Sequence, residues 1–250
     1  MSDLPTRRRL DQDLVARGLV STRARARDLI RRGEVEVAGA LAAKPAMMVD
    51  PAAAVRLVSG PADYVSRGAL KLRAALAHFG LDPSGRIAID VGASTGGFTE
   101  VLLAGGATRV YAVENGHGQL HPRLAADARV VSLERTDARR LDRMLVPDPL
   151  GVIVADVSFV PLAQVLPAAL ALAAPGCWLA VLVKPQFEAD PARVPRDGIV
   201  KDDAVRIDAV ERVARWMASL PGWRLLGWMP SPIRGGDGNV EYLLGATRDG

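Results

Sequence analysis

Cysteine is almost absent from this chain of 250 residues, since Cys177 is the only one. A single cysteine excludes an internal disulfide, and Cys177 lies in the apolar run GCWLAVLV, where a buried, unreactive thiol is expected. The amino-terminal sequence MSDLPTRRRL has no apolar stretch behind its basic residues, so we do not expect a signal peptide. These features predict a protein of the reducing cytoplasm.

Charge is missing from one long stretch of the chain. Residues 157–183 form a run of 27 residues without a charged side chain, which exceeds the roughly 20 residues needed to cross a bilayer. Pro167 and the pair Pro175-Gly176 interrupt this run. Because proline and glycine break regular structure, the pattern predicts a buried helix followed by a buried strand rather than a membrane span.

The net charge of +4 is confined to the first quarter of the chain. Residues 1–60 contain 11 Lys and Arg against 7 Asp and Glu, whereas residues 61–250 contain 21 of each. A small basic unit joined to a larger neutral one is typical of a nucleic-acid-binding module attached to a catalytic domain. A solvated basic face without a partner is the alternative.

The basic unit has the pattern of two short helices followed by a small sheet. In RLDQDLVARGL, Leu10 and Leu14 are spaced as on one helix face, and Gly18 predicts the helix end. The segment STRARARDLIRRG predicts a second helix ending at Gly33, and EVEVAG and AVRLV predict strands. The order and spacing of RLDQDLVARGLVSTRARARDLIRRGEVEVAG resemble the S4 RNA-binding domain.

This resemblance implies structured RNA as the partner, contacted through its backbone and shape rather than its base sequence. The arginines expected to contact RNA phosphates are Arg7, Arg23, Arg25, Arg27, Arg31 and Arg32.

Residues 61–250 alternate strand-like and helix-like segments. Apolar runs such as RIAIDVG, RVYAVE, GVIVADV and GCWLAVLVK are separated by helical patterns, which predicts a doubly wound α/β domain with a mainly parallel sheet. The last two strand candidates, WRLLGWM and VEYLLGATR, are close enough to pair antiparallel. Ligands of such sheets bind beyond the carboxyl ends of the strands, where the sequence predicts Asp90, Glu114, Asp156 and Lys184.

The segment DVGASTGGFT, residues 90–99, is a glycine-rich turn after a predicted strand. As a phosphate-binding loop of the Walker A type it lacks the lysine, because Phe98 occupies that position. As a dinucleotide-binding loop it lacks the second glycine, because Ser94 is found there. The pattern therefore disfavours a triphosphate and a dinucleotide as ligands, which leaves a tight turn without a ligand or a ligand without a pyrophosphate.

Acidic residues at successive strand ends favour an adenosine-containing ligand without a pyrophosphate. Glu114, 22 residues after Gly92, can accept both ribose hydroxyls, and Asp137 in ERTDAR is placed to bond the adenine amino group. S-adenosylmethionine is such a ligand. The residues expected to bind it are Asp90, Gly92, Ala93, Ser94, Gly96, Gly97, Phe98, Glu114, Asp137 and Asp156.

Lysine is scarce, with four among 32 basic residues. Lys71 lies in a predicted helix before the sheet. Lys184 is the first residue of KPQFE and directly follows a predicted strand. Two carboxylates, Asp156 in VADVSF and Glu241 in GNVEYLL, also fall at predicted strand ends. Taken singly, each of these four residues would more often form an ordinary ion pair.

Residues 64–245 resemble the TlyA family of rRNA 2′-O-methyltransferases, a branch of the FtsJ-like methyltransferases. The motifs that carry the resemblance are YVSRGALKL, DVGASTGGFT, YAVENGHGQL, RVVSLERTDAR, ADVSFV, LVKPQFEADPARVPRDGIVKD and SPIRGGDGNVEYLL. The family's catalytic tetrad then falls on Lys71, Asp156, Lys184 and Glu241, and its methyl-donor loop on residues 90–97.

The resemblance implies a Rossmann-like class I methyltransferase with a seven-stranded, mainly parallel sheet over residues 61–250, and a small α+β S4 RNA-binding domain over residues 1–60. It implies S-adenosylmethionine as cofactor and ribosomal RNA or ribosomal subunits as partner, with a cytidine as the acceptor and no metal or membrane. The family also carries an old haemolysin label, so a membrane-active protein is one alternative. An RNA-binding protein with an inactive methyltransferase fold is another.

The predicted chemistry requires an activated ribose hydroxyl, because a 2′-hydroxyl is a poor nucleophile. Lys184 is the candidate for this oxygen, either as the base that takes the proton or as the cation that stabilises the oxyanion, with Lys71, Asp156 and Glu241 as its neighbours. The sequence departs from the usual pattern at Glu114 and His117, where Asp and Tyr are common. We expect His117 to be a neighbour of the cofactor rather than a catalyst.

Overall fold

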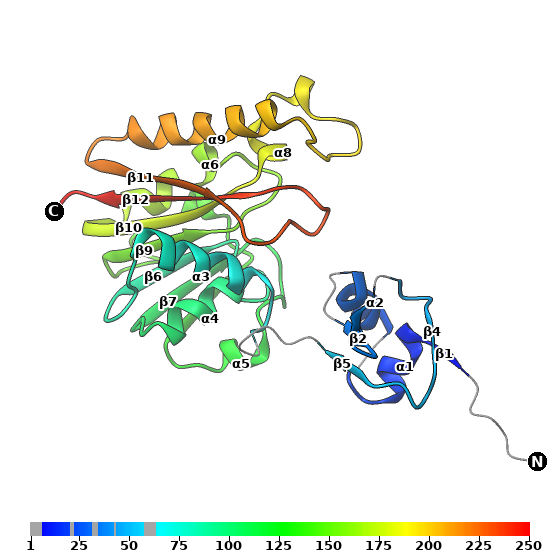
Figure 1. The fold of residues 1–250 in the computed structure, drawn as a ribbon. Coiled ribbons are helices and arrows are strands. Elements are labelled where there is room, and N and C mark those ends of the chain that lie inside the picture. The colour runs from blue at the N-terminus through cyan, green and yellow to red at the C-terminus, as the bar shows by residue number, and fades with distance from the viewer. Residues whose placement is uncertain (1–6, 21–22, 32–34, 43, 58–63) are drawn as a thin grey trace, which may run out of the picture. The chain divides into compact units, whose positions relative to one another are not determined.

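The computed structural model describes residues 7–20, 23–31, 35–42, 44–57 and 64–250 (Figure 1). The chain divides into two compact units between residues 63 and 64. The domain boundary expected at residue 60 falls in the range 58–63, outside the described residues.

The amino-terminal unit contains two helices, α1 (Leu10–Ala16) and α2 (Arg23–Arg31), as expected. Their apolar side chains, among them Leu10, Leu14 and Ile30, pack into one small core that includes Val35 and Val49. Helix α1 is followed by Gly18 with φ of +71°, a conformation that favours glycine, whereas the helix end expected at Gly33 lies outside the described residues.

Short antiparallel strands complete this unit. The order β3-β2-β5 forms a three-stranded sheet, and β1 pairs with β4. The sequence predicted β2 and β5 but not the pair β1–β4, because a strand of two residues has no measurable alternation. The bounds are β1 Arg8–Arg9, β2 Val35–Val37, β3 Ala40–Leu41, β4 Met48–Val49 and β5 Val55–Leu57.

The larger unit is built on a seven-stranded sheet in the order β11-β12-β10-β9-β6-β7-β8. The five strands from β10 to β8 are parallel, and β12 pairs antiparallel with both β10 and β11. This confirms the predicted mainly parallel sheet with an antiparallel carboxy-terminal pair. The bounds are β6 Ile87–Val91, β7 Arg109–Glu114, β8 Val130–Glu134, β9 Leu150–Ala155, β10 Ala173–Val183, β11 Trp223–Pro230 and β12 Tyr242–Arg248.

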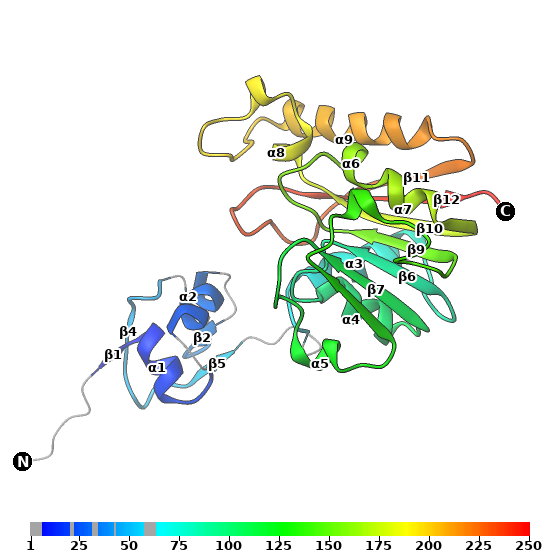
Figure 2. The same ribbon diagram turned by 180° about the vertical axis from the view of Figure 1, so that it is seen from behind.

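Helices cover both faces of this sheet (Figures 1 and 2). In β9, Val152 and Val154 pack into the core beneath α3, α4 and α5, whereas Ile153 and Ala155 pack into the core beneath α6, α7 and α9. Alternate side chains of one strand are thus buried on opposite faces, which explains its continuous apolar sequence. The helix bounds are α3 Gly68–Phe79, α4 Gly97–Ala104, α5 Pro122–Ala125, α6 Leu162–Val165, α7 Pro167–Ala171, α8 Pro185–Glu188 and α9 Asp203–Ala218, with 3₁₀ turns η1 Ala138–Arg140 and η2 Pro191–Arg193.

The long uncharged run forms α6, α7 and β10 inside the larger unit. The single predicted helix is two short ones, because Pro167 is the first residue of α7 and has no N–H to continue α6. The pair Pro175-Gly176 lies within β10, where pairing with β9 is interrupted, rather than before the strand. Within the described ranges, no helix is both long and apolar enough to cross a membrane. Cys177 is fully buried, and burial raises the pKa of its thiol to about 12.

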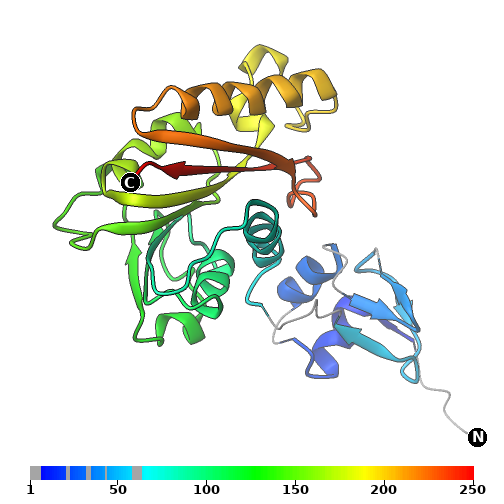
Figure 3. The ribbon, with the colours of Figure 1, turned by 60° about the vertical axis from the view of Figure 1, so that its left-hand side comes forward.

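The carboxyl edge of the sheet gathers the charged residues that the sequence places at strand ends. Asp90 is the next-to-last residue of β6, Glu114 ends β7, and Asp156 and Lys184 directly follow β9 and β10. Glu241 directly precedes β12, and because β12 runs antiparallel, its start lies at this same edge. Figure 3 shows the loop between β11 and β12 close to the amino-terminal end of α3.

Candidate active site

Four charged side chains from separate segments meet at the carboxyl edge. Lys184 Nζ lies 2.7 Å from Asp156 Oδ1, and Lys71 Nζ lies 2.6 Å from Glu241 Oε2 and 4.0 Å from Asp156 Oδ2. The result is an alternating chain of charges, Lys184–Asp156–Lys71–Glu241, whose four formal charges cancel. The side chains of Glu241, Lys71 and Lys184 are only 3%, 10% and 12% exposed, so their ion pairs are poorly screened by water.

Lys184 is held by two neighbours on the loop after β9. Besides its ion pair with Asp156, its ammonium donates a hydrogen bond of 2.8 Å to Ser158 Oγ. An ammonium has three donors, so Nζ keeps donor capacity for a further ligand. Asp156 and Ser158 both line the large cavity described next, which places this end of the charge chain at the cavity wall.

Gly92, in the glycine loop, lies directly against the backbone of Asp156 in the charge chain. Its φ is +81°, and a Cβ there would lie 2.7 Å from the carbonyl oxygen of Asp156. The Asp156 N–H in turn donates to the Val91 carbonyl at 3.0 Å. Only glycine allows this approach, so the turn after β6 fixes the backbone that carries Asp156.

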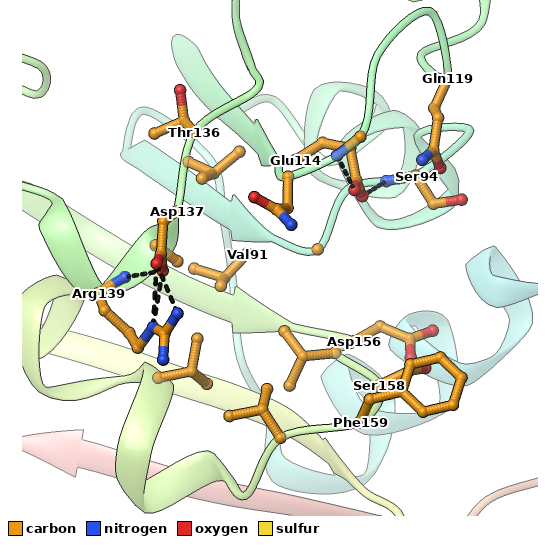
Figure 4. Close-up of a pocket in the computed structure, with 18 of the residues that line it drawn as sticks. Val91, Ser94, Glu114, Gln119, Thr136, Asp137, Arg139, Asp156, Ser158 and Phe159 are labelled. Carbon is orange, nitrogen blue, oxygen red and sulfur yellow. Dashed lines mark hydrogen bonds and ion pairs between the residues drawn. The ribbon is translucent and has the colours of Figure 1, made fainter.

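A cavity of about 770 Å³ lies at the ends of β6, β7 and β9 (Figure 4). Glu114 forms one side of it. Its Oε1 accepts a hydrogen bond from Gly116 N at 2.8 Å, and its Oε2 accepts one from Ser94 N at 3.0 Å. These bonds fix the carboxylate, and each oxygen retains a lone pair that can accept a ligand hydroxyl.

Asp137 lies on another wall of the cavity, away from Glu114 (Figure 4). Its carboxylate accepts hydrogen bonds of 2.7–3.0 Å from the guanidinium and backbone N–H of Arg139. The Arg139 side chain, and then its N–H, lower the pKa of Asp137 to about 2. Asp137 is therefore a charged acceptor at neutral pH, and Arg139 is a cavity residue that the sequence did not suggest.

Five of the ten residues expected to bind the cofactor line this cavity: Gly92, Ser94, Glu114, Asp137 and Asp156. The second half of the glycine loop instead serves helix packing. A Cβ at Gly96 would collide with the side chains of Leu120 and Leu124, and one at Gly97 would collide with Ser66 Oγ. Phe98 belongs to α4 and is buried in the core that α4 shares with α3, and Ala93 is buried in the same core.

Asp90 is fully buried behind the cavity wall. Its Oδ2 accepts hydrogen bonds from Thr99 N at 2.9 Å and Thr99 Oγ1 at 2.7 Å, whereas its Oδ1 is buried without a hydrogen-bond partner. Burial raises the pKa of Asp90 to about 7. Since a buried polar atom is normally satisfied, the unpaired Oδ1 favours a site completed by a donor or a positive charge.

Glu134 shapes the loop that follows β7, although sequence patterns did not single it out. Its carboxylate accepts hydrogen bonds from the N–H groups of Gly118, Gln119 and Leu120 at 2.7–3.2 Å. These bonds lower the pKa of Glu134 to about 2 and hold Gln119 at the cavity. His117 Nδ1 lies 3.2 Å from Glu134, and His117 is not among the residues that line the cavity.

Phe159 is an unusually exposed aromatic residue at the cavity mouth. Phe159 is 88% exposed, and its φ of +67° is a strained value for a bulky residue. Its ring lies 5.0 Å from the ring of Phe187, centroid to centroid. Sequence patterns did not single out Phe159; the only signal available was its place directly after Ser158 in the motif VADVSF.

The arginines expected to contact RNA differ from one another in their surroundings. Arg7 is exposed, and Arg23 and Arg27 project from α2 to the carboxylate of Asp11 in α1. Arg25 and Arg31 also belong to α2, whereas Arg32 lies outside the described residues. In the part of the chain that the structure describes, no group of three or more His, Cys, Asp or Glu residues could hold a metal ion.

Comparison with known proteins identifies the family. Residues 64–248 match the FtsJ-like methyltransferase family, and residues 8–55 match the S4 domain. The 16S/23S rRNA (cytidine-2'-O)-methyltransferase TlyA of Mycobacterium tuberculosis is 45% identical over 239 residues, which are 95% of this chain and 89% of that protein. Hemolysin A of Brachyspira hyodysenteriae is 36% identical over 236 residues, which are 94% of this chain and 98% of that protein.

A solved structure described as a hemolysin from Streptococcus thermophilus is 36% identical, with a TM-score of 0.77, and the match covers 98% of this chain and 90% of that one. Since the family model spans most of the chain and these relatives match nearly all of it, the chain belongs to the FtsJ-like methyltransferases and carries an amino-terminal S4 domain.

Proposed function

We propose that this methyltransferase transfers the methyl group of S-adenosylmethionine to the 2′-hydroxyl of a cytidine in ribosomal RNA. The observation that carries the proposal is the charge chain Lys184–Asp156–Lys71–Glu241 at the wall of a cavity with two fixed carboxylates. The name of the Mycobacterium tuberculosis relative, a 16S/23S rRNA (cytidine-2'-O)-methyltransferase, supports the acceptor.

The cavity residues fit the methyl donor. Glu114 would accept the ribose hydroxyls of the adenosine, and Asp137 would accept from the adenine amino group, since both are fixed carboxylates with acceptor capacity. The unpaired Oδ1 of buried Asp90 favours a cationic ligand near this wall. When bound, S-adenosylmethionine supplies an electrophilic methyl group on a positively charged sulfur.

Lys184 is the residue that acts on the acceptor oxygen. Its ammonium forms an ion pair with Asp156 and donates to Ser158, and it keeps donor capacity for an incoming hydroxyl. There Lys184 either takes the hydroxyl proton or donates a hydrogen bond to the developing oxyanion. Lys71 is bound to Glu241 and also lies near Asp156, so it fixes Asp156 and adds positive potential around Lys184.

The cavity has an exposed aromatic side chain that an RNA acceptor could contact. Phe159 is exposed next to Ser158, and aromatic side chains stack with bases that are unstacked from RNA. A strained, exposed phenylalanine in this position supports an RNA acceptor rather than a small molecule.

Glu114→Ala is expected to raise the dissociation constant of S-adenosylmethionine by about 10- to 100-fold, because it removes a charged acceptor of two hydroxyl hydrogen bonds. Isothermal titration calorimetry measures the effect. Glu211→Ala on the exposed surface of α9 is the matched control and should bind like the wild type. Unchanged affinity in Glu114→Ala would place the adenosine elsewhere.

Affinity for S-adenosylmethionine is expected to rise several-fold between pH 6 and pH 8. The pKa of Asp90 is raised to about 7 in the free protein, so the group is largely protonated at pH 6. A cationic ligand favours the ionised carboxylate, so binding releases a proton and strengthens as pH rises through 7. Titrations in buffers of different ionisation enthalpy measure that proton, and Asp90→Asn should abolish the proton release. An equal release in both proteins would contradict this role.

Replacing Arg23, Arg25 and Arg27 by glutamine is expected to weaken RNA binding and to reduce the slope of log Kd against log salt by about 2 to 3. Fluorescence anisotropy with a labelled rRNA fragment at several salt concentrations measures both quantities. The triple variant should keep wild-type affinity for S-adenosylmethionine. An unchanged slope would show that the basic unit does not anchor the RNA.

The proposed function is tested with labelled S-adenosylmethionine and four acceptors: intact ribosomes, each isolated subunit, and tRNA. Label in ribosomal RNA supports the proposal, and label in tRNA alone, or in none, contradicts it. Liposome leakage at the same protein concentration tests the alternative suggested by the hemolysin names of two relatives. Lysis without methyl transfer would favour that alternative.

A further inference from the structure

Asp11 is a completely buried carboxylate that binds three arginines. Arg9 donates from Nε to Oδ1 at 3.1 Å and from Nη2 to Oδ2 at 3.3 Å. Arg23 Nη2 and Arg27 Nε each donate to Oδ2 at 3.1 Å. Asp11 is 0% exposed, whereas the three arginine side chains are 41–45% exposed. We call these four residues the Asp11 cluster.

The cluster has more positive charge than it needs to neutralise the buried carboxylate. Among the side chains that the structure describes, this one carboxylate faces three guanidinium groups, an excess of two positive charges within the cluster. Hydrogen bonds from Arg9, and also from Arg27 and Arg23, hold the pKa of Asp11 well below its usual range, so the carboxylate stays ionised at neutral pH. Three guanidinium groups anchored on one point are spaced and oriented before any ligand arrives.

A second buried aspartate in the same helix shows a different arrangement. Asp13 is 3% exposed and binds Arg17 Nε at 2.6 Å. The guanidinium of Arg17 also donates to the carbonyls of Ala53 at 2.9 Å and Pro51 at 3.0 Å. Arg17 is therefore used inside the domain to hold a loop, whereas the arginines of the Asp11 cluster are half exposed.

We propose that Asp11 is a positioning residue for RNA binding: it fixes Arg9, Arg23 and Arg27 as one preformed surface for RNA backbone phosphates. Phosphate oxygens suit this surface because guanidinium donors match them in geometry and charge. The inference rests on the proposed function, since RNA is the partner it assumes. It adds Arg9, absent from the arginines expected from the sequence, and assigns a role in RNA binding to an acidic side chain.

Asp11→Asn distinguishes this role from a general charge effect. The substitution makes the basic unit more positive by one charge, which by long-range electrostatics alone would tighten RNA binding. Loss of positioning predicts the opposite. The Kd for a labelled rRNA fragment should rise about 10-fold or more, because three long side chains must be ordered on binding instead of beforehand.

Asp13→Asn is the matched control. It lies in the same helix, removes the same charge and breaks a buried ion pair, but it leaves the Asp11 cluster intact. It should bind the rRNA fragment at least as tightly as the wild type, at a loss of stability similar to that of Asp11→Asn in thermal unfolding. If both variants weaken RNA binding equally, or if Asp11→Asn binds as well as the wild type, the proposal is overturned.

A second pair of variants keeps the test decisive if Asp11→Asn does not fold. Arg9→Gln and Arg8→Gln change neighbouring residues of β1 and remove the same charge. The proposal predicts that Arg9→Gln weakens binding several-fold more than Arg8→Gln, and equal effects would contradict it. If the wild-type protein does not bind rRNA at all, the proposed function itself fails, whereas wild-type binding with neutral cluster variants overturns this inference alone.

Discussion

Lys184→Ala is expected to lower the rate of methyl transfer by at least about 10²-fold, since either role of the amine, proton transfer or oxyanion stabilisation, is worth that much. The amine contacts Asp156 and Ser158, two residues that line the cavity. Single-turnover transfer of labelled methyl to ribosomal subunits measures the rate. Affinity for S-adenosylmethionine and RNA should change little, because neither ligand is bound chiefly by this amine.

Lys184→Arg separates the two roles of the lysine. Arginine keeps the positive charge but cannot give up its proton at ordinary pH, so it can stabilise an oxyanion and cannot act as a base. Activity well above that of Lys184→Ala indicates the electrostatic role, and equal loss in both indicates the base. Near wild-type turnover in Lys184→Ala would remove Lys184 from the reaction altogether.

Lys71→Met is expected to destabilise the protein by about 3 kcal/mol or more, because it leaves Glu241 buried without its partner. For a unit of this size, such a loss lowers the melting temperature by about 6–12 °C. Methyl transfer should also fall by about 10²-fold or more, since Asp156 and Lys184 lose a neighbouring cation. Thermal unfolding and single-turnover rates measure the two effects.

The double variant Lys71→Met with Glu241→Leu tells stability apart from catalysis. Replacing a buried ion pair by apolar residues is often neutral for stability, so the melting temperature should return close to the wild-type value. Activity should stay as low as in Lys71→Met. Recovery of activity together with stability would mean that this ion pair only supports the fold.

The carboxyl edge of the sheet was the most predictable part of the molecule. Apolar strands followed by Asp156 or Lys184 predict charged residues at one edge, because parallel strands all end there, and the structure brings these residues together. The antiparallel β12 extends the same rule to Glu241, whose strand begins where the others end. The contact between Lys71 and Glu241, 170 residues apart, followed from the family resemblance and not from spacing.

The glycine loop was only half predictable, because a sequence motif does not distinguish a ligand contact from a packing contact. Gly92 approaches the backbone of Asp156 at the cavity wall, whereas Gly96 and Gly97 make room for side chains of neighbouring elements. Residues such as Glu134 and Asp11 could not be identified beforehand. Each carboxylate accepts hydrogen bonds from three other residues. Those residues are brought to it only by the tertiary fold.

The most direct test of the account is to find the chemical position of the methyl group. Ribosomal subunits are incubated with the protein and S-adenosylmethionine carrying a deuterated methyl, and the rRNA is digested to nucleosides for mass spectrometry. We predict deuterated 2′-O-methylcytidine with the wild type and none with Lys184→Ala. Deuterium on a nucleobase, or equal labelling by Lys184→Ala, would contradict a lysine-assisted transfer to the ribose hydroxyl.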